Sequence, residues 1–184
     1  MKKTKILLLS LVLVSVLGIG NLSARESTVA VGIQAGFVAT GVVLDLQLGS
    51  LGFSAGLNYP IGYTYIASLA EASDEDLFAN AATVTADITT AFDLSDSFSL
   101  KVGICTIALT NFGPTFGGVA GPCLKGEYWI PNKRTGLFVN LNAPVMLYGV
   151  AVSEFGESDS AVVFSPWLPL AGLFTTTFGV LYGF

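Results

Sequence analysis

Apolar side chains occupy every second position over most of this chain, and small or polar residues fill the positions between. In the stretch LGFSAGLNY, residues 51–59, Leu, Phe, Ala, Leu and Tyr alternate with Gly, Ser, Gly and Asn. This is the period of a β-strand, whose successive side chains point to opposite faces. The repeated pattern predicts eight strands, over 28–37, 41–49, 51–59, 81–92, 97–108, 122–130, 135–147 and 173–184.

The connections between these stretches alternate between short and long. Three are short, at 49–50, 93–97 and 131–134, and Gly at the first position of the first suits a type II′ hairpin turn. Longer connections lie over 60–80, 109–122 and 148–172. Short turns on one side and long loops on the other are typical of a closed antiparallel up-and-down β-barrel. The fold class is therefore all-β, with eight strands. A ten-stranded barrel that also uses 61–70 and 161–170 is the alternative.

Composition decides which face of the barrel points inward. The chain is 52% hydrophobic and only 11% charged, against about 25% charged in an average soluble domain. With the small polar face outside, the protein would have a nearly uncharged surface. An eight-stranded interior is narrow and filled by side chains, which suits small residues. We expect the apolar face to meet lipid, and the opposite face, rich in glycine, to line the lumen. These glycines are Gly32, Gly36, Gly52, Gly56, Gly103, Gly179 and Gly183.

Aromatic residues gather near the predicted strand ends, where a transmembrane barrel has its aromatic girdles. One set lies by the short turns and the other by the long loops: Phe92, Phe98 and Phe184, then Phe37, Tyr59, Tyr148 and Phe174.

Five charged residues have the parity of the lumen face: Asp45, Asp87, Lys101, Lys125 and Glu127. Charges inside a membrane protein must pair or be hydrated. Because eight strands leave little room for water, we expect a structural plug of salt bridges. An ion path is the alternative.

Turn length predicts part of the strand register. The two-residue turn at 49–50 places Asp45 opposite Ser54. A tight link over 38–41 would place Gln34 opposite Asp45 on its other side.

The two cysteines of the chain, Cys105 and Cys123, bracket a long loop and share the lumen parity. In an exported chain they are expected to form a disulfide. If they face each other, Lys101 lies opposite Glu127 and Lys125 opposite Gly103. The next hairpin would then place Glu127 opposite Asn140, Lys125 opposite Asn142 and Trp129 opposite Phe138.

Several kinds of chemistry are disfavoured. The chain has no histidine, which removes the commonest general base and metal ligand. Its net charge of −5 makes nucleic acid an unsuitable partner. Residues 52–56 match G-x-S-x-G, but Ser54 lies within an alternating strand and lacks a histidine partner. We expect no enzymatic activity, no cofactor and no metal. A polytopic helical protein is the alternative fold, since 135–153 and 160–184 lack charge.

The first residues have the pattern of a secretory signal. Lys2, Lys3 and Lys5 precede an apolar run, and a cleavage site is plausible after Ala24. We expect residues 1–24 to be removed and 25–184 to form the barrel.

The last strand carries the sharpest pattern, with Phe178, Val180, Tyr182 and Phe184 at alternate positions. It is similar to the C-terminal signature of bacterial outer-membrane β-barrels, and the mature chain, over residues 28–184, resembles the small OmpA/OmpX/OmpW-type barrels. This resemblance implies export through the periplasm, recognition by the barrel-assembly machinery and residence in outer-membrane lipid. We expect a non-enzymatic structural barrel that displays surface loops. A narrow conduit for small, hydrophobic molecules and a surface adhesin are the alternatives.

Overall fold

The computed structural model describes residues 25, 27–62, 81–110, 112, 116–152 and 158–184. The predicted signal peptide and most of the 60–80 connection lie outside these residues. The described chain is mostly antiparallel strand, and no helix in it is long and apolar enough to cross a membrane. The helical alternative is therefore not supported. The strands are β1 (Val29–Gly36), β2 (Thr40–Leu48), β3 (Leu51–Tyr59), β4 (Ala82–Asp93), β5 (Phe98–Thr110), β6 (Phe116–Trp129), β7 (Thr135–Asn142), β8 (Met146–Val152), β9 (Ser158–Phe164) and β10 (Thr177–Gly183).

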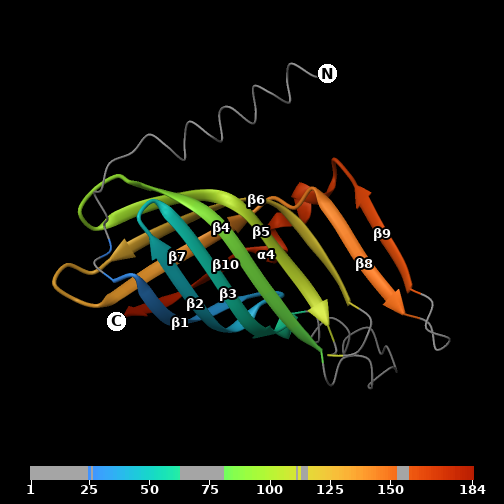
Figure 1. The fold of residues 1–184 in the computed structure, drawn as a ribbon, viewed down its shortest axis with the longest axis horizontal. Helices are drawn as coiled ribbons and strands as arrows, with labels where there is room; N and C mark the ends of the chain where they lie inside the picture. Colours follow the sequence, from blue (N-terminus) through green and yellow to red (C-terminus); the bar gives the residue numbers. More distant parts are fainter. Residues whose placement is uncertain (1–24, 26, 63–80, 111, 113–115, 153–157) are drawn as a thin grey trace, which may run out of the picture.

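Eight of these strands form a closed barrel (Figure 1). Neighbours pair in the order β1-β2-β3-β4-β5-β6-β7-β10, and β10 returns to pair with β1. The all-β, eight-stranded up-and-down barrel is thus confirmed. The turn between β2 and β3 is also as predicted, since Gly49 has a φ of +60° and Leu48 pairs with Leu51.

The strands β8 and β9 lie outside the ring, so the ten-stranded alternative is wrong. β8 pairs with the N-terminal end of β6, and β9 pairs only with β8 among the described residues. The predicted strand 135–147 divides because a β-bulge interrupts it. Two residues of β6, 121 and 122, face three residues, 143–145, between β7 and β8. The buried Pro144 lies in this bulge, where its missing N–H costs no ladder hydrogen bond.

The last strand is also shorter than the predicted 173–184. The segment before it forms a 3-10 turn, η1 (Leu168–Ala171), with a proline in its first turn, and a short helix, α4 (Gly172–Thr175). Strand geometry begins at Thr177. Residues 174 and 176 follow the alternating sequence pattern of β10, but they lie before the strand begins.

Strand register gives the tilt of the barrel. From Gln34, the hydrogen-bonded row through β2, β3, β4 and β5 reaches β6 at Gly117. The row through β10 and β7 reaches β6 at Glu127, ten residues away. The strands are thus staggered by ten residues once around the ring. This stagger, divided by the circumference of eight interstrand spacings, gives a strand tilt of about 40° from the barrel axis. At this width the interior holds side chains rather than an open channel.

The distribution of polarity is inverted relative to a soluble protein. Val42, Ile88 and Ile104 on the outer wall are 55%, 57% and 67% exposed, whereas Asp45, Lys101 and Glu127 inside are 2% exposed or less. The predicted orientation of the two faces is correct on every strand of the ring. The predicted lumen glycines also lie where space is short: a Cβ on Gly103 would collide with the backbone oxygen of Ile88.

Two glycines on neighbouring strands test this crowding. Gly103→Ala should lower the free energy of unfolding by about 1–3 kcal/mol, because the added methyl group meets backbone on the inner wall. Gly126→Ala is the matched control. Its Cβ would lie 3.6 Å from the nearest atom, on Phe98, and should change stability by less than about 0.5 kcal/mol. Urea unfolding in lipid vesicles, followed by tryptophan fluorescence, measures both. Equal effects would contradict the crowded interior.

Candidate functional site: a charged barrel interior

Asp45 lies at the centre of the interior, on β2. It pairs with Ser54 on β3, as the tight turn predicts. Its partner on β1 is Ala30 rather than Gln34, so the predicted register on that side is wrong by four residues. The last pair of this hairpin is Gln34 with Gly41, so the chain reverses over residues 35–40, and the even shift of β1 leaves the same residues facing inward. Asp45 therefore keeps its inward position.

Ion pairs cross the barrel from Asp45 to the opposite wall. The strands β2 and β6 lie four strands apart in either direction around the ring. Even so, Lys125 Nζ on β6 lies 2.5 Å from Asp45 Oδ2, and Lys101 Nζ on β5 lies 3.5 Å from Asp45 Oδ1. Glu127 Oε1 completes the network, at 2.7 Å from Lys101 Nζ and 3.1 Å from Lys125 Nζ. The charged side chains thus span the full width of the lumen.

Arg25 is a third cation in this network, and sequence reasoning missed it. Its guanidinium pairs with the Asp45 carboxylate and donates to the Asp45 carbonyl oxygen at 3.0 Å. It also lies over the Trp129 ring, 5.1 Å from the centroid. Arg25 precedes the first alternating stretch, so no periodicity indicated which way it points. Charge balance was the available signal. The five predicted lumen residues comprise three carboxylates and only two lysines, so one more cation was needed.

Two aromatic residues border the charges. Trp129 Nε1 donates to Glu127 Oε2 at 3.2 Å, and Lys125 Nζ lies 4.9 Å from the centroid of Phe138. Both contacts stabilise charge in a region poor in water. The contact between Lys125 and Phe138 depends on the β6–β7 register, which differs by two residues from the prediction: Glu127 faces Phe138, Lys125 faces Asn140 and Cys123 faces Asn142.

The predicted disulfide is not formed, and both cysteines are free. The β5–β6 register is also two residues from the expected one, so Cys105 faces Gly121 and Cys123 faces Gly103. In this register Lys101 faces Lys125, an arrangement that would repel without the two carboxylates they share. The Lys101–Glu127 ion pair is nevertheless present, as a diagonal rather than a direct pair.

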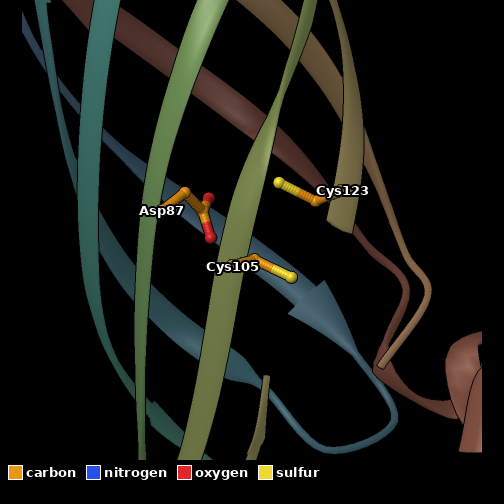
Figure 2. A group of neighbouring side chains, drawn as sticks. All are labelled: Asp87, Cys105 and Cys123. Atoms are coloured by element: carbon orange, nitrogen blue, oxygen red, sulfur yellow. The ribbon is translucent and has the colours of Figure 1, made fainter. Parts of the chain in front are cut away.

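Asp87 stands apart from the ion pairs, next to the two thiols (Figure 2). Its Oδ2 accepts hydrogen bonds from Ser54 Oγ at 2.7 Å and from Asn140 Nδ2 at 3.2 Å. Cys105 Sγ donates to Asn142 Oδ1 at 3.1 Å. The five predicted lumen residues are therefore all in the interior, four of them in the ion-pair network and Asp87 beside the cysteines.

Comparison of the chain with protein-family models, curated proteins and solved structures gives no match. The role of the interior is therefore inferred from its own residues and their geometry. What this arrangement does is hold opposite walls together and fill the lumen with paired charge.

Removing one charge tests how strongly the network is coupled. Asp45→Asn should destabilise the barrel by about 3–5 kcal/mol, because it leaves buried cations without their shared carboxylate. Lys125→Met should also destabilise, and the double variant should lose less than the sum of both, by about 1–3 kcal/mol. Asp96→Asn, in an exposed turn, is the control. Strictly additive effects in urea unfolding would contradict a direct interaction across the lumen.

Proposed function

We propose that this protein is an integral β-barrel of a bacterial outer membrane, with a closed lumen and no enzymatic role. The observation that carries the proposal is the inverted polarity: a continuous apolar outer wall around a core of paired charges. Soluble monomers rarely expose apolar patches larger than a few hundred Å². Lipid is the environment in which such a wall is stable.

The aromatic residues at the two ends of the barrel support a membrane location. Tyr182 and Phe184 are in edge contact at 5.5 Å at one end, and Phe37 and Phe174 at 5.3 Å at the other. Tyr128 and Tyr59 are exposed near the same two ends. Aromatic girdles of this kind sit at the two interfaces of a bilayer. Tyr148 departs from the expected girdle, since it lies on β8 and its hydroxyl is hydrogen-bonded to that of Thr106 at 2.6 Å.

The closed lumen favours structural display of loops over a conduit. Ion pairs join β2 to β6, and hydrogen bonds join β1 to β4 and β7 to β4. Any path along the barrel axis has to break these contacts. In this proposal the barrel anchors the loops, and the loops make whatever contacts the protein has at the cell surface.

Conductance across planar bilayers separates the two functions. The wild-type protein should give no reproducible channels under conditions in which a known porin does. Asp45→Ala/Lys125→Ala, which removes the pair across the lumen, should raise conductance relative to Asp96→Ala, provided both give a heat-modifiable band on gels. Clear, stable channels from the wild type would overturn the closed barrel and favour the conduit.

Assembly through the barrel-assembly machinery gives a second test. Phe184 and Phe164 are similarly exposed, at 68% and 72%, but only Phe184 continues the alternating pattern of β10. Phe184→Ala should reduce the amount of protein in the outer-membrane fraction several-fold, while Phe164→Ala should not. Quantitative immunoblots of separated membranes measure both. Equal levels for the two variants would count against recognition of this strand.

A further inference from the structure

Three consecutive strands bring two thiols and a carboxylate together inside the barrel. Asp87 on β4 pairs with Cys105 on β5, and Cys123 lies on β6, diagonal to Cys105. The two sulfur atoms and a carboxylate oxygen lie within 4.8 Å of one another. Figure 2 shows the three side chains directed into the same part of the interior. The salt-bridge network does not use any of them.

We propose that Cys105, Cys123 and Asp87 form a binding site for one Zn²⁺ ion. Two thiolates and a carboxylate belong to the donor types that bind Zn²⁺ in proteins, and thiolates exclude the harder Mg²⁺ and Ca²⁺. Zn–S bonds of about 2.3 Å and Zn–O bonds of about 2.0 Å place tetrahedral ligands roughly 3.5–3.8 Å apart. The donors, which lie within 4.8 Å of one another, therefore need to close by at most about 1.3 Å to bind one ion.

Neighbouring side chains already hold the ligands in place. Ser54 and Asn140 both donate to Oδ2 of Asp87, which leaves Oδ1 for the metal. Hydrogen bonds of this kind to a ligating carboxylate are typical of metal sites. Asn142 Oδ1 accepts a hydrogen bond from Cys105 Sγ at 3.1 Å and so fixes the position of that thiol, which leaves the fourth position of the metal to a water molecule.

An unpartnered buried oxygen is a second observation that points to a ligand at this place. The Oδ1 atom of Asn140 is buried and has no hydrogen-bond partner among the described residues. Its residue is only 6% exposed, and its Nδ2 holds Asp87. Buried polar atoms are almost always satisfied. A water molecule bound to the metal would donate to this oxygen.

Charge balance permits the ion. The charged side chains of the described interior are Arg25, Lys101 and Lys125 against Asp45, Asp87 and Glu127, three of each sign. Binding of Zn²⁺ forms two Zn–S bonds and breaks two S–H bonds, and the two protons leave to solvent. One divalent cation replaces two protons, so the net charge inside the barrel does not change. Zinc binding therefore adds no unbalanced charge to the barrel interior, where such a charge would be costly.

Metal content after folding tests the proposal. The full chain is folded from urea into detergent with equimolar Zn²⁺, passed through a desalting column and analysed by mass spectrometry. We expect about one Zn²⁺ per chain for the wild type and less than about a tenth of that for Cys105→Ser/Cys123→Ser. Asp87→Asn should retain less zinc than Asp96→Asn, which should match the wild type. A heat-modifiable band shows that each variant is folded.

A spectroscopic readout on the wild type needs no variant. Co²⁺ in place of Zn²⁺ should give a thiolate-to-cobalt charge-transfer band, and Mg²⁺ in tenfold excess should not reduce it. Zinc retention that is equal in the wild type and the double variant would overturn the proposal, as would a wild type that folds without retaining zinc or showing the cobalt band. Because these outcomes do not depend on where the barrel resides, they are independent of the conductance and localisation experiments.

Discussion

The ion pairs between Asp45 and the cations of the far wall are the interaction on which the rest of the structure depends. They join β2 to β5 and β6 across the lumen, and they exist because the barrel is narrow. A ring of eight strands tilted by about 40° leaves an interior one side chain deep from each wall. Charges placed there can reach one another, and they must do so, because little water is present to solvate them. The small residues around them follow from the same lack of space.

Sequence parity predicted the two faces correctly, but register only where a turn constrained it. The two-residue turn at Gly49 gave the β2–β3 pairing without error. The other tested registers, β1–β2, β5–β6 and β6–β7, were wrong by four, two and two residues. Every error is even, because an odd shift would turn apolar side chains into the lumen and is excluded by the pattern. A register shift of two or four residues keeps the same side chains inside the barrel, so the alternating pattern does not distinguish one such register from another.

The remaining differences have local causes. Pro144 lies in a bulge that alternation does not reveal, and β8 begins directly after this bulge. Arg25 joins the core from outside the periodic stretches. The two cysteines share the inner face as predicted, but with Cys105 facing Gly121 they are not paired. Each of these depends on the tilt and stagger of the closed ring, which is a property of all eight strands together rather than of any one segment.

Contacts between individual methyl groups and lipid acyl chains test the central claim most directly. Val42 and Val43 are adjacent on β2 but 55% and 4% exposed, and Ile104 and Ile107 on β5 are 67% and 6% exposed. In methyl-labelled protein embedded in lipid nanodiscs, nuclear Overhauser effects to acyl-chain protons should be strong for Val42 and Ile104. They should be absent for Val43 and Ile107. Acyl-chain contacts at Val43 or Ile107, or none at Val42 and Ile104, would contradict an apolar wall around a charged, closed interior.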